Sequence, residues 1–309
     1  MRLGTNTRYD VIALGCCTID HLCRVPHIPR DDKVEIGELL IGGGGPAATA
    51  VFAAARLGAK TAYLGAVGDD ENGKQILKEL KKENVNISGV MIRPGAISPT
   101  AYCWIDQNTG KRSIAWSRGS VEALRAKEVK EKMKGKICSS RILHLDGHHP
   151  EAAIYTAKLA KKHGIKVFLD AGTFRPHMKD LMGLSDVVIA SEVFAKQMTG
   201  GNDIKCALMK IHEYGPEWTV ITLGAKGAIA YSGGKIIVQR AFKVDVVDTT
   251  GAGDVYHGAF ACKYLSCGDL AEVMRFSSAV AAMKCRKLGG RNGIPKLEEA
   301  EEFINRQKI

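Results

Sequence analysis

Short apolar runs alternate with longer amphipathic segments along most of this chain. The runs with the length of buried strands cover residues 10–17, 62–68, 141–146, 166–171, 186–191 and 219–224. Segments with helical periodicity cover 46–58, 72–84, 150–164, 203–215, 252–268 and 270–286, and several begin at a proline or capping residue and end at a glycine. This alternation predicts a mainly parallel sheet with helices on both faces, which binds ligands beyond the carboxyl ends of its strands.

Two regions depart from this alternation. Residues 33–43 and 99–120 have the character of strands without intervening helices. The second region is expected to form a hairpin, with a polar, glycine-containing turn at Gln107–Lys111. These strands predict a small separate sheet that acts as a lid over a ligand cleft. No linker, low-complexity tract or internal repeat interrupts the sequence, so we expect a single domain over residues 1–309.

Composition narrows the class of protein. The 309 residues are 45% hydrophobic, enough for a sizeable core, and no apolar run reaches the length of a membrane span. The polar N-terminus lacks the apolar core of a signal peptide, and the nine cysteines show no CxxC pairing or metal-ligand spacing. We therefore expect a cytoplasmic protein with free thiols and no membrane partner.

The formal net charge of +11 raises the question of nucleic-acid binding. The lysines and arginines are spread over helical segments such as 74–84 and 127–136, where they are mixed with glutamates. No basic stripe with interleaved aromatic residues is present. We therefore expect no nucleic-acid partner, because a small anionic substrate suits the positive charge at least as well.

The strongest chemical signal is the run 245-DVVDTTGAGDVYHGAF-260, which follows an apolar segment and precedes a helical pattern. Its glycines allow a tight turn that exposes N–H groups, and the following helix N-terminus adds donors and a positive dipole end. Together they predict a phosphate site. Asp254 falls in the first helical turn, where N–H donors would keep it ionised and able to accept a hydroxyl proton; helix capping is its alternative role. Just upstream, Asp248 and Thr250 offer oxygens for a hard cation.

Two other nucleotide-binding motifs compete with this interpretation. No Gly-Lys pair is followed by Ser or Thr, so a P-loop is absent. The segment 43-GGGPAA-48 fits the dinucleotide fingerprint, with Asp69 about 25 residues further on, but it lies in the expected lid strand rather than after the first strand. The same segment is also compatible with a plain turn before a helix, or with a turn whose N–H groups contact a polyhydroxylated ligand.

These motifs resemble one family over nearly the whole chain. The run 248-DTTGAGD-254 before a helix is similar to the C-terminal signature of the PfkB, or ribokinase-like, sugar kinases, and 42-GGGGPAATAVFAAARLGA-59 is similar to their N-terminal signature. The segments 65-GAVGDDENG-73 and 222-TLGAKGA-228 resemble the segment after that signature and the nucleotide-side loop. Within the family, the ketose kinases look closest, including ketohexokinase and above all sulfofructose kinase. The resemblance implies an α/β fold, with a central, mainly parallel sheet flanked by helices and a small β-sheet lid.

The resemblance also implies roles for individual residues. Asp254 would accept the proton of the sugar hydroxyl, and the backbone of Gly251, Ala252 and Gly253 would form the anion hole for the transferring phosphate. The other implied contacts are sugar hydroxyls at Asp20, Gly44 and Gly45, ATP at Thr222, Gly224 and Gly227, and a monovalent cation such as K⁺ at Asp248, Thr250 and the backbone near 286–290. Mg²⁺ would arrive with ATP.

The chain departs from the family pattern at its metal-organising motif. Many members carry Asn-x-x-Glu before the Thr-Gly pair that is 199-TG-200 here. The matching residues are Ser191 and Phe194, so the motif is missing. Glu192 either replaces part of it as a contact for Mg²⁺ or faces solvent.

The sugar-binding positions differ as well. The family's asparagine in the first signature is matched by Thr49. At the positions where the sulfosugar kinase would recognise a sulfonate, Lys33 is kept, while Ser117 and His148 replace asparagine and arginine. The adjacent Arg118 would supply the missing charge. The alternative role of Lys33 is an exposed lid lysine.

These features predict an ATP-dependent sugar kinase that phosphorylates a primary hydroxyl of a ketohexose-like sugar, such as fructose or a 6-substituted fructose like sulfofructose. The alternatives are a nucleoside kinase of the same fold, with Trp104 or Trp116 stacked on the base, a nicotinamide-dinucleotide oxidoreductase and a non-catalytic sensor. Exposed strand edges of the lid also favour a homodimer.

Overall fold

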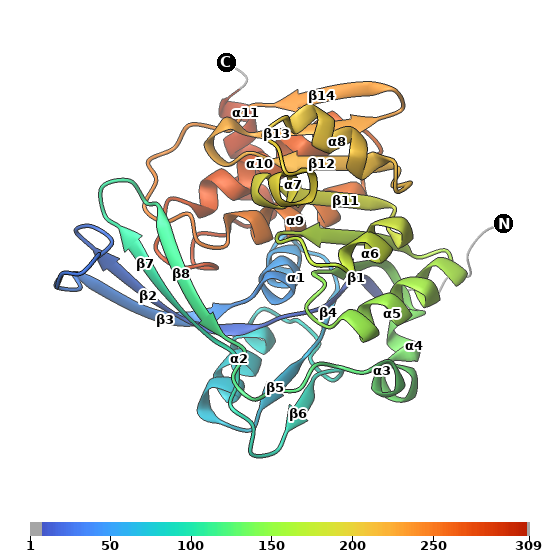
Figure 1. Cartoon of the computed structure of the whole chain (residues 1–309), viewed down its shortest axis with the longest axis horizontal. Helices are drawn as coiled ribbons and strands as arrows, with labels where there is room; N and C mark the ends of the chain where they lie inside the picture. Colours follow the sequence, from blue (N-terminus) through green and yellow to red (C-terminus); the bar gives the residue numbers. More distant parts are fainter. Residues whose placement is uncertain (1–7, 308–309) are drawn as a thin grey trace.

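The computed structural model describes residues 8–307, and Figure 1 shows how their elements are arranged. An eight-stranded sheet runs through the molecule in the order β14-β13-β12-β11-β10-β9-β1-β4. Its strands are β1 (Tyr9–Leu14), β4 (Thr61–Leu64), β9 (Ser140–Leu145), β10 (Lys166–Ala171), β11 (Val187–Ser191), β12 (Trp218–Thr222), β13 (Ala228–Ser232) and β14 (Lys235–Gln239). The strands from β12 to β4 are parallel, and β13 and β14 are antiparallel to their neighbours. The fold class expected from the sequence is confirmed.

Helices cover both faces of this sheet, because its buried strands alternate apolar side chains between the two faces. On β10, Val167 and Leu169 pack into one core cluster, while Phe168 packs into another with Phe260. The helices on the first face are α3 (Ala126–Lys132), α4 (Lys134–Ile137), α5 (Pro150–Lys162), α6 (Met178–Leu184), α7 (Glu192–Thr199) and α8 (Ile204–His212). The other face carries α1 (Pro46–Arg56), α2 (Glu71–Lys82), α9 (Ala252–Tyr264), α10 (Leu270–Lys284) and α11 (Leu297–Arg306).

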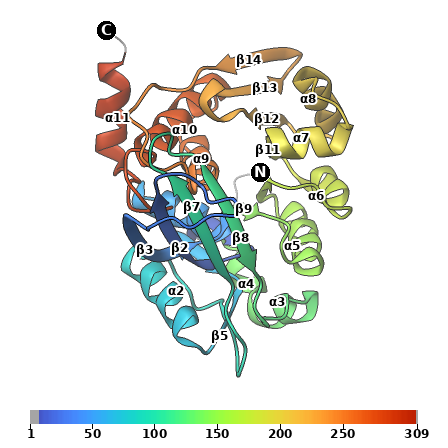
Figure 2. The same ribbon diagram turned by 60° about the vertical axis from the view of Figure 1, so that its left-hand side comes forward.

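A four-stranded sheet of order β3-β2-β7-β8 stands out from one side of the molecule (Figures 1 and 2). We call it the lid; its strands are β2 (Thr18–Val25), β3 (Glu38–Gly44), β7 (Thr100–Asp106) and β8 (Arg112–Ser117). Strands β2 and β7 are parallel, and the other pairs are antiparallel. A short pair, β5 (Ala66–Gly68) and β6 (Met91–Arg93), lies below it.

The lid differs from its sequence-based prediction in two respects. The strand expected over 33–43 begins only at Glu38, so Lys33 lies in a loop. The strand β2 was not predicted, because the first apolar run was extended to Cys17. In the structure β1 ends at Leu14, and Gly15 packs so closely on the carboxyl group of Asp146 that a Cβ would collide with it. The chain turns there and enters the lid.

Among the residues that the structure describes, no helix is both long and apolar enough to cross a membrane. The nine cysteines are all free, as expected.

Candidate active site

The expected catalytic loop, residues 248–254, lies at the N-terminus of α9, beyond the carboxyl ends of the parallel strands. Gly251 adopts a left-handed conformation with φ 73° and caps α9, which begins at Ala252. A Cβ on Gly251 would lie 2.9 Å from the carbonyl oxygen of Gly290, so a neighbouring turn closes one side of the loop. A Cβ on Gly253 would meet no described atom within 4 Å. The N–H donors of the helix end are therefore open on the side of Gly253, as an anion site requires.

Asp254 is half-buried in the first turn of α9. Burial raises the pKa of its carboxyl group to about 6; nearby Arg112 opposes the shift, and Asp20 and Asp146 add to it. Loss of hydration thus dominates the pKa of Asp254, and the N–H donors expected from the sequence do not lower it below its ordinary value. The carboxylate still predominates above pH 6, so Asp254 remains able to accept a proton at neutral pH.

Asp248 and Thr250, the residues expected to hold a cation, lie directly before the loop. The buried carboxylate of Asp248 accepts hydrogen bonds from the backbone N–H groups of Thr250 at 2.7 Å and Gly289 at 2.8 Å. The ammonium of Lys284 donates to the carbonyl oxygen of Asp248 at 2.8 Å and lies 4.0 Å from its Oδ2. Within residues 8–307, the buried hydroxyl of Thr250 has no hydrogen-bond partner.

Asp20 projects from β2 of the lid and is 6% exposed. Burial raises the pKa of this carboxyl group, and a hydrogen bond from the Thr18 hydroxyl opposes the shift. Gly44 packs against it so closely that any side chain would collide with the carboxylate. Gly45, at φ 85°, packs in the same way on the backbone of Cys17. The glycine run therefore lets β3 and the start of α1 pack closely against Asp20 and Cys17. Because the run follows β3 and not β1, it does not stand where a dinucleotide fingerprint would belong.

Thr49 is buried in α1, where its hydroxyl accepts a hydrogen bond from Nε of Arg291 at 3.2 Å. Arg291 also donates to the carbonyl oxygen of Gly44 at 2.8 Å. The hydroxyl of Thr49 is thus engaged by the protein itself. Arg291 follows Gly290 in the turn that packs against Gly251, and no sequence motif singled it out.

Trp116, Ser117, Arg118 and His148 meet at the rim between the lid and β9. The indole ring of Trp116 lies edge-on to the imidazole of His148 at 5.6 Å, and Arg118 lies 5.9 Å over the indole. The guanidinium of Arg118 is 3.5 Å from the carbonyl oxygen of His148, and it forms no ion pair with a carboxylate of the described residues. Of the candidate sulfonate contacts, Arg118 and His148 are therefore close together, while the hydroxyl of Ser117 accepts a hydrogen bond from the N–H group of Gly119 at 3.1 Å. Lys33 is exposed in its loop, without a partner among the described side chains.

Strand register separates the two tryptophans of the lid. Trp116 pairs with Ala101, which pairs with Asp20, so these three side chains share the face that carries the acidic residue. Trp104 pairs with Cys23 on the opposite face. Only Trp116, of these two, is placed to contact a substrate.

The loop expected to bind ATP joins β12 to β13. Thr222 ends β12 and donates to the carbonyl oxygen of Ala190 at 3.3 Å. Gly224 and Gly227 have positive φ angles of 57° and 99°, and together with a short 3₁₀ turn they make a tight, partly exposed loop. On the next strand end, Glu192 pairs with Lys196 of the same helix at 3.0 Å, so its charge is partly compensated.

Asp146, which the sequence analysis also did not single out, organises the end of β9. Its buried carboxylate accepts hydrogen bonds from the N–H groups of Cys16 at 2.7 Å, Ala47 at 3.2 Å and His148 at 2.9 Å. Burial raises its pKa, but His148 and the N–H donors outweigh burial, so the pKa is lowered overall. Asp146 is therefore a fixed negative charge beside Asp254.

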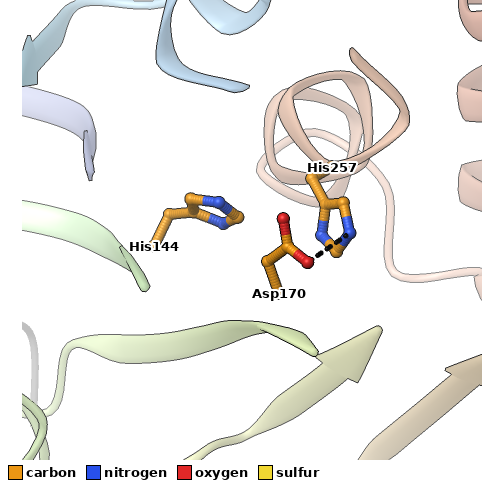
Figure 3. A group of neighbouring side chains, drawn as sticks. All are labelled: His144, Asp170 and His257. Atoms are coloured by element: carbon orange, nitrogen blue, oxygen red, sulfur yellow. Dashed lines mark ion pairs between the residues drawn. The ribbon is translucent and has the colours of Figure 1, made fainter. Parts of the chain in front are cut away.

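His144, Asp170 and His257 form a buried group beneath the site (Figure 3). Asp170 reaches His257 at 3.4 Å, and the rings of the two histidines are 5.5 Å apart. Burial lowers the pKa of His144 to about 4 and that of His257 well below its usual range, while burial and then Asp254 raise the pKa of Asp170. Burial thus shifts each of the three groups toward its neutral form.

Known proteins resemble the chain over nearly its full length. The model of the pfkB family carbohydrate kinases matches residues 9–297. A ribokinase from Haemophilus influenzae is 29% identical over 305 residues, which cover 96% of this chain and 99% of the relative. The crystal structure of a proposed ribokinase from Agrobacterium tumefaciens is 30% identical, with a TM-score of 0.87, and the match covers 97% of this chain and 98% of the other.

A solved ribokinase from Arabidopsis thaliana, complexed with ribose and ATP, has a TM-score of 0.82 at 24% identity and coverages of 96% and 98%. It supports the same fold. Because the family model matches residues 9–297, the chain belongs to the pfkB family of carbohydrate kinases, which are ATP-dependent phosphotransferases.

Proposed function

We propose that this kinase transfers the γ-phosphate of Mg-ATP to a primary hydroxyl of a ketohexose-like sugar, with Asp254 as the general base. The observation that carries the proposal is the joint placement of Asp254 and the open N–H end of α9 at Gly251–Gly253. A loose phosphoryl transition state needs positioned donors for its charge and a base that takes the hydroxyl proton late.

In the proposed reaction, the sugar oxygen forms a bond to the γ-phosphorus while the bond from that phosphorus to the bridging oxygen of ADP breaks. The proton of the sugar hydroxyl passes to the carboxylate of Asp254, and ADP carries away the electron pair of the broken bond. The N–H groups of Gly251, Ala252 and Gly253 donate to the transferring phosphoryl oxygens. Asp20, with Gly44 and Gly45 behind it, holds sugar hydroxyls.

The rim supports an acceptor with an anionic substituent. Arg118 has no carboxylate partner among the described residues, and His148 and Trp116 surround its guanidinium with polar and aromatic surface. A phosphate or sulfonate at the sugar carbon far from the reacting hydroxyl would compensate that charge. Ser117 follows Trp116 on β8 and its side chain points to the opposite face of the lid, while Lys33 would have to approach on lid closure.

Ribose and a nucleoside are the alternative acceptors. Ribose is favoured by the names of the relatives in Haemophilus and Arabidopsis. A nucleoside is favoured by Trp116, whose half-exposed ring on the inner lid face could stack on a base.

The nucleotide would lie along the loop of Thr222, Gly224 and Gly227. The exposed backbone of this loop, next to the carboxyl end of β12, fits a ligand that spans from there to the anion hole. Mg²⁺ would be held mainly by the phosphates, and Glu192 would contribute only after release from Lys196.

ADP release with a panel of acceptors tests the function: fructose, fructose 6-phosphate, 6-deoxy-6-sulfofructose, tagatose 6-phosphate, ribose and adenosine. We expect an anionic ketose to give the highest kcat/KM, with the preference lost in Arg118→Gln. A preference for a neutral ketose, for ribose or for adenosine would reject the anionic acceptor and leave the kinase chemistry in place. Silence across the panel would contradict the proposed acceptor class.

A further inference from the structure

Lys284 occupies an unusual position for a lysine. It lies in the last turn of α10, and its side chain is 0% exposed. An ammonium group in the interior is costly unless it is paired and hydrogen-bonded. The burial of this ammonium group therefore requires compensating interactions with the residues around it.

The contacts of Lys284 lead directly to the catalytic loop. Its ammonium donates to the carbonyl oxygen of Asp248 at 2.8 Å and lies 4.0 Å from the carboxylate of the same residue. That carboxylate accepts from the N–H groups of Thr250 and Gly289. The ammonium and the carboxylate thus tie together the segment before Gly251 and the turn that packs against it.

The end of α10 strengthens the same connection. The carbonyl oxygen of Cys285 accepts hydrogen bonds from the N–H groups of Val247 at 2.8 Å and Asp248 at 3.1 Å. The negative end of the helix dipole also favours a cation in the last turn. Burial lowers the pKa of Lys284, and the charge of Asp248 opposes that shift, so Asp248 favours the charged form of the lysine.

We propose that the ammonium of Lys284 is the built-in cation of the anion hole, which positions Gly251–Gly253 through Asp248 and makes phosphoryl transfer independent of free monovalent cations. This inference rests on the proposed function. Lys284 is a positioning residue, since it does not touch the phosphate.

A free K⁺ ion at Asp248 would meet two obstacles. Both carboxylate oxygens and the carbonyl oxygen of this residue already accept hydrogen bonds or face the ammonium. A second positive charge at this distance from Lys284 would also be repelled. The remaining oxygens of the cation site expected from the sequence are the hydroxyl of Thr250 and the backbone carbonyls near 286–290, which would have to hold the ion without help from Asp248.

The first test uses the wild-type chain with the best acceptor of the panel. ADP is measured directly by chromatography, so that no coupling enzyme responds to the cation. Turnover is compared in tetramethylammonium buffer with and without about 0.1 M K⁺ at matched ionic strength. We expect a change below about twofold, whereas a fall of more than about tenfold without K⁺ would overturn the inference alone. Silence in both buffers would reject the proposed function and this inference with it.

The second test removes the ammonium. Lys284→Met should lower kcat by about 10²-fold, because misplaced donors lose much of their effect, and Lys284→Ala should regain at least about tenfold with NH₄⁺ or K⁺. Lys161→Met is the matched control, since Lys161 also lies in the last turn of a helix but is exposed. Full activity of Lys284→Met without any monovalent cation would contradict the proposal. If the variants fail to fold by circular dichroism, the wild-type comparison decides.

Discussion

At the scale of single residues, Asp254 lies where burial and neighbouring carboxylates both disfavour its charge. Since its pKa is raised to about 6, kcat/KM for the proposed reaction should rise with pH through about 6 and reach a plateau above it. A pH–rate profile of the wild type with a non-titrating acceptor measures this. A profile that is flat between about pH 5 and 8 would show that Asp254 is not the base.

Asp254→Asn separates the catalytic role from the structural one. A buried group with a raised folded pKa contributes stability that is present below its ordinary pKa and lost as pH rises through the folded pKa. The variant should therefore lose about 10²–10⁴ in rate and yet denature at a higher temperature than the wild type near pH 8, with the difference closing near pH 4. Thermal denaturation at the two pH values, beside the rate, checks both parts. Near-normal turnover would exclude the general-base role.

The two glycines of the loop should respond differently to a side chain. The space in front of Gly253 is open, so Gly253→Val should fold normally but obstruct the phosphate, with a loss of about 10² or more in kcat. Gly251→Ala meets both a left-handed φ and the backbone of Gly290, so it should also lower the denaturation temperature. Kinetics and thermal melts of the pair distinguish the effects. Unchanged activity in Gly253→Val would mean that no phosphate binds there.

How far the sequence could predict these residues depended on whether a local motif carried them. Asp254 and its glycines lie within the seven residues 248–254, so the sequence alone is enough to recognise the motif. Asp146, Arg112 and Lys284 act through partners far away in sequence, and no local motif marks them. The apolar surroundings of Lys284 in 270–286 were a usable clue, because lysine is seldom fully buried.

At the scale of elements, the parallel strands of the main sheet were predicted, because each is a buried apolar run, whereas the antiparallel β13 and β14 and the short helices α6 and α7 were not. The prediction was weakest in the lid. The hairpin of β7 and β8 was predicted, but β2 carries the polar residues Thr18, Asp20 and His21 and so does not look like a buried strand. The connection from β1 to β2 was missed because its bend depends on the contact between Gly15 and Asp146, which only the fold brings together.

The lid hairpin gives a prediction at this scale. Gly110, at φ 64°, packs on Val246, and its carbonyl oxygen accepts a hydrogen bond from the Thr249 hydroxyl at 3.0 Å, beside Arg112. Gly110→Ala would push the hairpin off the catalytic loop, and we expect about a tenfold loss in kcat. Gly95→Ala is the control, because Gly95 has a similar φ of 69° but open space around it. Equal effects of the two substitutions would mean that backbone strain, and not docking of the hairpin, matters.

At the scale of the whole molecule, the two faces of the lid have different surroundings: one covers the candidate site and the other is exposed. Its inner face carries Asp20 and Trp116 over the site, while its outer face leaves Leu39 56%, Ile41 44% and Tyr102 49% exposed. Register places Ile41 and Tyr102 on either side of His21, whose ring stacks on Tyr102 at 4.8 Å, so these side chains form a continuous patch. Such a patch on a projecting sheet favours pairing with a second copy.

We therefore expect a homodimer that buries the outer faces of two lids. Ile41→Lys combined with Tyr102→Glu should convert it to a monomer in size-exclusion chromatography with light scattering, because each charge would be desolvated at the interface. Ile236→Lys is the matched control, since Ile236 is 45% exposed on β14, away from the lid. A dimeric mass in the lid variant would place the interface elsewhere, and a monomeric wild type would reject lid pairing. Because the same strands carry Asp20 on their inner face, a monomeric variant should also show a raised KM for the sugar, which links assembly to the site through one sheet.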